Sequence, residues 1–389
     1  NGDFCKYHSD ESNRYFGLIT ENRPEEPYKG GTRHYWIDQY KPKNKRGRKK
    51  KELKMKAISL FSGMGGDSVG IVKAGLDLVA YSEWEKDMRD THELNFPDTK
   101  LLGCGDITKT SDDEFLKYKD IVDLIFAGFP CQGFSNAGKK KINDPRNSLF
   151  REFVRATKLV NPKFIIGENV KGLLSRKTDG DEMYIDVIKS EFEKLGYNIK
   201  YKVFDCEKYG IPQKRHRIIV AGFRKDLKIT FKVPKPSFKK MSVYKALSNI
   251  PEKASHQELT KQSDQVIERL RYIKPGQNAW NADIPSHLQL NVPNSRLSHI
   301  YRRLEKDEPA YTLTGSGGGG THMYHWEENR ALTNRERARI QTFPDFYNFS
   351  GSKESIRKQI GMAIPPKGIQ IICNAILSSL YKVEYESVL

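Results

Sequence analysis

The sequence of 389 residues lacks the long apolar run that a membrane-spanning helix requires. No run reaches the roughly 18 apolar residues of such a helix, and the polar N-terminal segment lacks the charged-then-apolar pattern of a signal peptide. Cysteine is sparse and shows no paired spacing, occurring as Cys5, Cys104, Cys131, Cys206 and Cys373. An odd number of scattered cysteines is not a disulfide framework. We therefore expect an intracellular protein with reduced thiols and no membrane partner.

Two common phosphate-binding motifs and any zinc site are also missing. Neither the G-x-G-x-x-G of a dinucleotide fold nor the G-x-x-x-x-G-K-[ST] phosphate loop occurs. Cys5 and His8 form a C-x-x-H pair, but no second pair completes four ligands at zinc spacing. We therefore expect no metal and no cofactor with a long phosphate chain.

Acidic residues are too few to balance the basic ones. The chain has 67 Lys and Arg against 49 Asp and Glu, a formal net charge of +18, which favours a polyanionic partner such as nucleic acid. Residues 41–56 contain ten basic residues and one acidic residue, and so supply half of this excess. Residues 1–54 lack apolar periodicity, so a solvated linker and a nonspecific phosphate-binding arm are equally good interpretations. The run RGRKKK would suit nuclear import; in a prokaryote we expect a cytoplasmic protein.

A different pattern begins at Met55. Apolar, strand-like runs (AISLF, LVAYS, VDLIFAG, KFIIGEN and RIIVAGF) alternate with helix-like stretches such as NSLFREFVRATKLV and YIDVIKSEFEKLG. This alternation predicts an α/β fold in which helices cover both faces of a parallel sheet. Because ligands of such sheets lie at the carboxyl ends of the strands, we expect the functional residues directly after the apolar runs.

The first three segments each end in residues suited to an adenosine. Gly63 and Gly65 lie in a strand-to-helix turn, where glycines allow close backbone approach, although an ordinary tight turn explains them about equally well. Glu83 ends the next run, where an acid accepts hydrogen bonds from ribose hydroxyls, and Trp84 beside it could stack on an adenine. Asp106 in GDIT suits an adenine amino group. An adenosine without a long phosphate chain fits this set, and S-adenosylmethionine is the candidate cofactor.

Cys131 follows the fourth apolar run, in GFPCQGFS. A free cysteine is more often a packed small hydrophobe than a nucleophile. A loop at the ligand edge, in which Pro130 fixes the backbone before the thiol, nevertheless favours a reactive thiolate. Addition of a thiolate to carbon 6 of a pyrimidine would let carbon 5 attack a methyl donor. Glu168, at the next strand end, could relieve the ring charge at N3, although a helix-capping acid is the alternative.

Two arginines alternate in YGIPQKRHRIIVAG. Arg215 and Arg217 are predicted to share one face of a strand, from which they could hydrogen-bond a pyrimidine carbonyl and a phosphate. A basic edge strand without a ligand is the alternative interpretation.

Taken together, the chain resembles the cytosine-C5 DNA methyltransferases. FSGMGG, SEWEKD, GDIT, GFPCQGFS, ENVKGLL and YGIPQKRHR occur in the family's unpermuted order, and a variable stretch separates them from LTNRERARIQTFP and QIGMAIPPKG. The similarity covers about residues 57–225 and 297–380. It implies a Rossmann-like, S-adenosylmethionine-dependent sheet with a smaller, irregular target recognition domain. It also implies methyl transfer to carbon 5 of a flipped-out cytosine in a specific duplex, through a covalent Cys131–cytosine intermediate.

The resemblance also implies a role for each matching residue. The cofactor site would comprise Phe61, Gly63, Gly65, Glu83, Trp84, Asp106, Ile107, Pro130 and Met362, the last of which stands where the family more often has asparagine. The catalytic set would be Cys131 as nucleophile, Glu168 at N3 and Arg217 at the base carbonyl, with Arg215 and Asn169 in support. The DNA contacts would come from Gln132, Ser135 and Arg146, in a loop that closes over the duplex, and from Thr312 at a phosphate.

The same comparison predicts how the chain is divided. The expected units are a basic extension (1–54), a catalytic and cofactor-binding domain (55–225), a target recognition domain (226–330) and a C-terminal segment that completes the catalytic domain (331–389). The expected partner is double-stranded DNA, bound by a monomer.

Two other interpretations stay open. The first is an RNA (tRNA) cytosine-C5 methyltransferase on the same fold, although PCQGFS matches the DNA-acting majority. The second is a catalytically inactive DNA-binding subunit, which would be expected to have lost the thiol, the N3 acid or the cofactor loop. None of these three features is lost.

Overall fold

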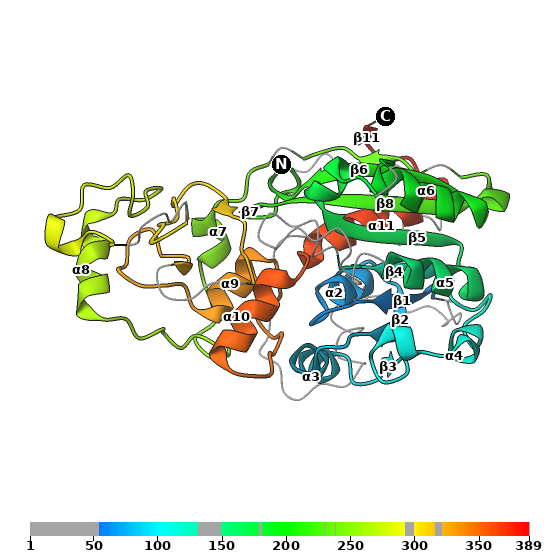
Figure 1. The fold of residues 1–389 in the computed structure, drawn as a ribbon, viewed down its shortest axis with the longest axis horizontal. Helices are drawn as coiled ribbons and strands as arrows, with labels where there is room; N and C mark the ends of the chain where they lie inside the picture. The colour runs from blue at the N-terminus through cyan, green and yellow to red at the C-terminus, as the bar shows by residue number, and fades with distance from the viewer. Residues whose placement is uncertain are drawn as a thin grey trace, which may run out of the picture.

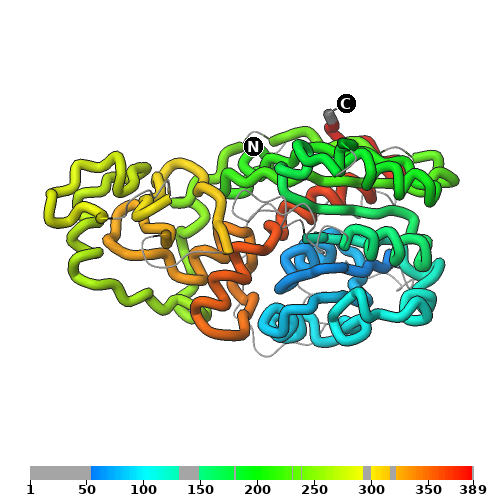
Figure 2. The backbone as a smooth tube through the Cα atoms, in the orientation of Figure 1, coloured from blue at the N-terminus to red at the C-terminus, as the bar shows by residue number. Residues whose placement is uncertain are grey.

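A computed structural model describes residues 54–130, 149–178, 181–229, 231–237, 239–291, 299–315 and 321–388. Figure 1 shows two lobes side by side, of which one holds a large sheet. The chain passes from this sheet into the second lobe and then returns, so that its red C-terminal end lies beside the sheet again (Figure 2).

The large sheet has seven strands in the spatial order β3-β2-β1-β4-β5-β8-β6. They are β1 (Lys56–Leu60), β2 (Asp77–Ser82), β3 (Lys100–Leu101), β4 (Leu124–Ala127), β5 (Phe164–Val170), β6 (Tyr197–Asp205) and β8 (His216–Arg224). Strands β1 to β5 pair in parallel, which confirms the predicted α/β architecture. The expectation of a parallel sheet is wrong at β8, which runs antiparallel to both β5 and β6. Only a short link joins β6 to β8, and an antiparallel pair needs no helical crossover.

Helices cover both faces of this sheet (Figure 1). They are α2 (Gly66–Lys73), α3 (Lys86–Asn95), α4 (Asp112–Leu116), α5 (Phe150–Val160), α6 (Tyr184–Lys194) and α11 (Pro366–Leu380). Neighbouring strand residues point to opposite faces. Ala57 and Phe126 therefore pack in one core with α2 and α11, whereas Ile58 and Ile125 pack in another with α5 and α6. This double burial explains why the strands are apolar throughout.

The second lobe has a small core of its own. Its helices are α7 (Val243–Leu247), α8 (Asp264–Tyr272), α9 (Asn334–Ile340) and α10 (Lys353–Met362). Two short pairs connect distant parts of the chain, β7 (Gln213–Lys214) with β10 (Ala310–Tyr311) and β9 (Val233–Pro234) with β11 (Ser387–Val388). Leu270, Ile273 and Tyr324 form the lobe's core, while Ile340 of α9 and Ile360 of α10 join the core under the sheet. After β8 the described chain adds no further strand to the large sheet.

Short 3₁₀ helices complete the described part of the chain. They are η2 (Ile107–Lys109), η5 (Lys171–Ser175), η6 (Cys206–Tyr209), η7 (Lys225–Leu227) and η8 (Ser286–Leu288). Three of them, η5, η6 and η7, directly follow a strand of the large sheet. The turn η2 matters below, because Asp106 caps it.

One segment of the described residues, Lys353–Leu380, is long and apolar enough to cross a membrane by length and composition alone. Most of its apolar window, 61 %, is buried inside the fold, and α10 and α11 are separate helices divided at Ala363. Ile369, Ile372 and Ile376 of α11 pack in the core that α2 shares. A buried core helix of this kind accounts for the segment.

Candidate active site

The turn after β1 is shaped by three residues with positive φ. Phe61 and Gly63 both have φ of 56° and Gly65 has φ of 95°, a region that glycine adopts without cost. A Cβ atom on Gly65 would lie 2.8 Å from the Tyr347 hydroxyl and 3.0 Å from the His92 ring. Glycine is therefore required at this position by close packing, and its N–H donates to the Ser62 carbonyl at 3.0 Å.

Glu83 joins the ends of two neighbouring strands. Its Oε2 accepts a hydrogen bond from the Gly63 N–H at 2.8 Å, and its Oε1 accepts one from the Glu85 N–H at 2.8 Å. The side chain is 7 % exposed, and this burial raises its pKa above the usual value. Each carboxylate oxygen has a second lone pair, so the group can still accept hydrogen bonds from a diol.

The residues after β2 and β3 differ in exposure. Trp84 is 71 % exposed beside the buried Glu83, and Ile107 is 4 % exposed. Asp106 accepts hydrogen bonds from the N–H and hydroxyl of Thr108, at 3.1 and 2.7 Å, and lies 3.4 Å from Lys109. The Thr108 hydrogen bond is the main reason that the pKa of Asp106 is lowered. Asp106 is thus held as a charged acceptor.

These residues fit an S-adenosyl nucleoside. Phe61 and Gly63 in the turn after β1 are partly exposed, Glu83 offers a buried diol acceptor, and Trp84 offers an exposed aromatic face. All of them lie at the carboxyl edge of the parallel strands, where such sheets bind ligands. No group of three or more His, Cys, Asp or Glu side chains within the described ranges could hold a metal ion.

Glu168 lies at the same edge, in β5. The Arg217 Nε lies 2.8 Å from Glu168 Oε1, and both side chains are 15 % exposed. Ala127 of β4 pairs with Gly167, so the chain that leaves β4 passes beside Glu168. A Cβ on Gly128 would lie 3.9 Å from Glu168 Oε2. This carboxylate and guanidinium therefore flank the segment that leads to Cys131.

Asn169 fixes that segment. Its Nδ2 donates to the Phe129 carbonyl at 3.0 Å, and its Oδ1 accepts from the Val170 N–H at 2.8 Å. Asn169 is 3 % exposed, so both bonds are shielded from water. Pro130 is the last described residue of the segment. The predicted Cys131, Gln132, Ser135 and Arg146 lie outside the described residues.

Arg215 lies directly before β8, two residues from Arg217. Its charge interacts with those of Arg217 and Glu168. Arg215 is 2 % exposed and donates to the carbonyls of Leu313 at 2.9 Å and Ala363 at 3.0 Å. Burial lowers its pKa to about 9. Its contacts tie the chain before β8 to the second lobe and to the start of α11, which is a positioning role.

Thr312 and Met362 lie near a close contact between the backbones of Thr314 and Gly361. The Thr312 hydroxyl donates to the Lys214 carbonyl at 2.6 Å, and Met362 is 45 % exposed. A Cβ on Gly361 would lie 2.1 Å from the Thr314 carbonyl oxygen, so glycine is required where the two chains meet. A hydroxyl has one hydrogen to donate, so the predicted phosphate contact of Thr312 would require it to give up its hydrogen bond to the Lys214 carbonyl.

Several residues that pack against the turn after β1 are not predicted from the sequence. The Tyr347 hydroxyl donates to the Met64 carbonyl, and the Ser59 hydroxyl donates to Asp67. Asp67 is 2 % exposed, and burial raises its pKa to about 7. Its place directly after Gly66, in an otherwise apolar helix start, is the one cue that the sequence offers.

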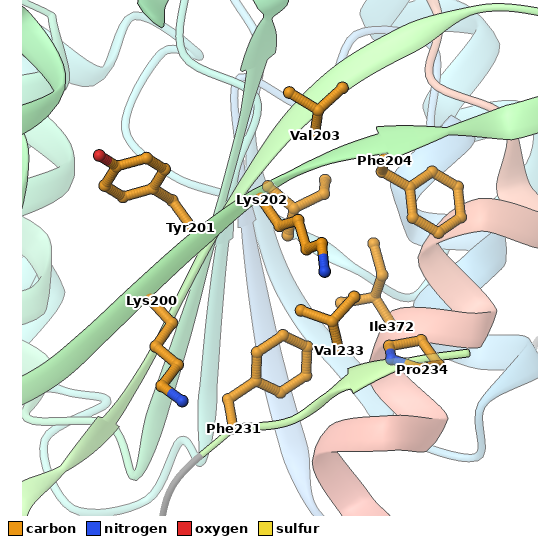
Figure 3. Close-up of a pocket in the computed structure, with 10 residues that line it drawn as sticks. Lys200, Tyr201, Lys202, Val203, Phe204, Phe231, Val233, Pro234 and Ile372 are labelled. Carbon is orange, nitrogen blue, oxygen red and sulfur yellow. The ribbon is translucent and has the colours of Figure 1, made fainter. Parts of the chain in front are cut away.

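A pocket on the far edge of the sheet is unrelated to these residues. It is lined by Lys200, Tyr201 and Lys202 of β6 together with Phe231 and Val233 (Figure 3). None of its lining residues belongs to the predicted site. The free thiols of the described part are Cys104, which is exposed, and Cys206 and Cys373, which are buried.

Comparison with known proteins gives a consistent result. The family model of C-5 cytosine-specific DNA methylases matches residues 55–378. Type II methyltransferase M.BbvI of Brevibacillus brevis is 40 % identical over 356 residues, which span 86 % of this chain and 94 % of M.BbvI. M.NgoFVII of Neisseria gonorrhoeae is 37 % identical over 349 residues, spanning 86 % of this chain and 89 % of that protein.

Solved structures share the fold. A prophage protein of Escherichia coli, assigned as a DNA modification methyltransferase, aligns with a TM-score of 0.70 and 24 % identity, over 84 % of this chain and 99 % of that one. Spodoptera frugiperda DNMT2 aligns with a TM-score of 0.57 and 20 % identity, again over 84 % and 99 %. The smaller lobe and the large sheet are therefore a recurring architecture.

Proposed function

The chain belongs to the C-5 cytosine-specific DNA methylase family and is a DNA cytosine-5-methyltransferase, and we propose that it acts on a flipped-out cytosine through a covalent bond from Cys131 to carbon 6. The observation that carries the proposal is the placement of Glu168 and Arg217. These two form an ion pair at the strand end beside the segment that leads into Cys131. A carboxyl and a guanidinium there suit the N3 and carbonyl edge of one cytosine.

The reaction begins at the thiol. A thiolate at Cys131 adds to carbon 6 of the ring, and the charge that appears on the ring is neutralised by a proton at N3. We propose that Glu168, a carboxylate in its ion pair with Arg217, takes up a proton from solvent and delivers it to N3, and that Arg217 hydrogen-bonds the ring carbonyl. Asn169 keeps the chain before Cys131 in place through the Phe129 carbonyl. Once carbon 5 is methylated, loss of its proton to a base and of the N3 proton to solvent would re-form the ring double bond, break the carbon–sulfur bond and release the Cys131 thiolate.

The cofactor site would be formed by the residues at the ends of the first three strands. S-adenosylmethionine, the methyl donor of this family, supplies an electrophilic methyl group that carbon 5 attacks once carbon 6 carries sulfur. Phe61, Gly63 and Gly65 would line the cofactor cradle, and Glu83 would accept hydrogen bonds from the ribose. Trp84 and Ile107 would flank the adenine, and Asp106 would accept from its amino group.

The biological setting follows from the relatives. Both are named Type II methyltransferases, so we infer that this chain methylates a specific duplex as part of a restriction-modification system. We propose that it works as a monomer with the units 1–54, 55–225, 226–330 and 331–389. The packing of α11 against α2 supports a C-terminal segment that completes the catalytic domain.

The proposal is tested by trapping the covalent complex. Duplex DNA containing 5-fluorocytosine at the target should form a complex that survives a denaturing gel, because fluorine at carbon 5 blocks the final elimination. Cys131→Ser should form none and should methylate below about a hundredth of the wild-type rate, since an alcohol does not ionise at neutral pH.

Cys104→Ser is the matched control, because Cys104 is an exposed free thiol that the proposed mechanism does not use. It should trap and methylate like the wild type. Bisulfite sequencing of treated genomic DNA identifies the methylated sequence, and transfer RNA serves as the competing substrate. Wild-type enzyme that methylates 5-fluorocytosine DNA without a trapped complex would refute the covalent route.

A further inference from the structure

Helix α9 carries three arginines that differ in their partners. Arg335 is fully buried and donates to the carbonyls of Ser255 at 3.0 Å and Tyr347 at 2.7 Å. Arg339 donates to Asp345 Oδ1 at 2.7 Å. Both guanidiniums thus have acceptors that offset the cost of burial.

Arg337, between them, has no such compensation. Its side chain is 5 % exposed, and its Nε has no hydrogen-bond acceptor among the described residues. None of the ion pairs found within the described ranges includes it. Burial, with a smaller contribution from the charge of Arg357, lowers its pKa to about 10. A buried guanidinium without an anion is costly, so the site is short of negative charge.

Two more basic side chains lie within electrostatic range of Arg337. Arg357 of α10 lies 3.4 Å from His322 Nδ1 through its Nη1, and its side chain is 15 % exposed. His322 is 7 % exposed, and burial together with the charges of Arg357 and Arg337 lowers its pKa to about 4. The one acidic side chain near this cluster in the described part is Glu354, which is 81 % exposed and 3.7 Å from Arg357 Nη2.

We propose that Arg337, Arg357 and His322 form a binding site for a phosphate-type oxyanion, which the cluster takes from the backbone of the DNA substrate or from solution. Two guanidiniums can hold a phosphate with several charge-assisted hydrogen bonds, and a neutral histidine adds one donor. Arg357 is the member that is partly open to solvent, so it makes the first contact, and Arg337 adds its charge from behind.

The backbone of the substrate is the favoured source. Tyr311 of β10 lies within electrostatic range of Arg337. It directly precedes Thr312, for which the resemblance implies a phosphate contact, and β10 pairs with β7, the strand before β8. This source rests on the proposed function, because it takes duplex DNA as the substrate. Contacts of this kind position a duplex without reading its sequence.

The first arm of the test measures binding of inorganic phosphate by thermal denaturation at constant ionic strength. Phosphate should raise the melting temperature of the wild-type protein, and Arg357→Gln and Arg337→Gln should each lose at least half of that rise. Lys194→Gln is the matched control, because it removes one positive charge from an exposed side chain of α6. It should keep the full rise, which separates site binding from the general stabilising effect of phosphate.

The second arm measures the affinity for duplex DNA against salt concentration. Arg357→Gln should weaken binding to all duplexes alike and reduce the slope of log K against log salt by about 0.9, the value for one bound phosphate. The methylated sequence should not change. Arg357→Gln could instead lose the stabilisation by phosphate while its DNA binding depends on salt as in Lys194→Gln. The site would then bind a free oxyanion from solution, and the proposal of an oxyanion site would still hold.

Equal phosphate effects in Arg357→Gln and Lys194→Gln would overturn the proposal. If Arg337→Gln fails to fold, Arg357→Gln decides alone, because Arg357 is the more exposed of the two. The covalent trap keeps the two proposals apart. If the wild type forms no trapped complex but Arg357→Gln still reduces the slope of log K against log salt, the covalent mechanism is refuted and the oxyanion site is supported.

Discussion

At the residue scale, position relative to a strand end decides what each side chain can do. Glu83 and Glu168 are predictable from strand ends, and both lie at one edge of the sheet with hydrogen-bonding or charged partners. The partners of Arg215 cannot be predicted in this way. Its guanidinium donates to the Leu313 and Ala363 carbonyls, which lie in distant parts of the chain that a local pattern does not contain.

Asp67 gives a prediction about pH. Burial raises the folded-state pKa of this carboxyl from 3.8 to about 7, so between these values the folded protein holds a proton that the unfolded chain has lost. Stability should therefore fall as pH rises from about 4 to 7, by up to about 1.4 kcal/mol per pH unit from this group. Asp67→Asn removes the group, and its free energy of unfolding should fall less over this range.

Urea denaturation of both proteins between pH 5 and 8 measures the difference. The raised pKa of Glu83 acts in the same direction, but it is present in both proteins and cancels. The stability of Asp67→Asn relative to the wild type should increase up to about pH 7 and then stay level. A constant difference across the range would show that Asp67 is already ionised in the folded protein.

At the element scale, the sequence predicts the existence of strands better than their direction. The apolar runs correspond to β1, β2, β4, β5 and β8, since burial on both faces makes each strand apolar throughout. The same burial hides whether a strand runs parallel or antiparallel, which is why the expected direction of β8 is wrong. Strand β6 escapes prediction because its residues Lys200, Tyr201 and Lys202 are exposed on the edge of the sheet.

The turn between β1 and α2 gives a prediction whose control lies at the other end of α2. Gly65 precedes this helix and Gly75 follows it. Gly65 and Gly75 have φ of 95° and 91°, so alanine should cost roughly 1–2 kcal/mol of backbone strain at either position. A Cβ on Gly75 meets nothing within 4 Å, whereas one on Gly65 would press on Tyr347 and His92. We expect Gly65→Ala to weaken S-adenosylmethionine binding at least tenfold and Gly75→Ala to leave it unchanged.

Isothermal titration of the cofactor against both variants distinguishes strain from displacement of the turn. Circular dichroism and thermal denaturation establish that each variant is folded before it is titrated. If Gly65→Ala binds the cofactor as tightly as Gly75→Ala, this turn does not form the cradle that the resemblance implies.

At the scale of the whole molecule, the candidate site and the most basic segment lie in different parts of the chain. The candidate site is formed at the ends of strands from β1 to β8, whereas half of the excess positive charge lies in residues 41–56. Deletion of residues 1–54 should weaken binding to all duplexes alike and flatten the salt dependence, by about 0.9 log unit for each phosphate that the truncated protein no longer binds. The methylated sequence should stay the same.

Bisulfite sequencing and salt-dependent binding of the truncated protein test this division of labour. A solvated linker that does not touch DNA would leave both affinity and slope unchanged, which supports the alternative interpretation of this segment. A truncated protein that methylates a different sequence would show instead that the segment reads bases.

The roles proposed for Glu168 and Cys131 also constrain the shape of the substrate. Glu168 lies beside the segment that leads into Cys131, and in these roles both would have to approach one cytosine, at N3 and carbon 6. Inside a duplex, N3 is paired with guanine and neighbouring bases cover the ring faces. The base must therefore leave the stack, at a cost of a few kcal/mol that is smallest where the partner pairs poorly.

A mismatched partner at the target should accordingly strengthen binding there, by up to a few kcal/mol if the opening cost is fully recovered. A 2-aminopurine at the target should brighten on binding, because stacking no longer quenches it. One duplex series, with the mismatch moved along the site, provides both measurements and its own controls at the other positions. Equal affinity at every position, without brightening at the target, would refute base flipping and with it the roles proposed for Cys131 and Glu168, because neither side chain can reach a stacked cytosine.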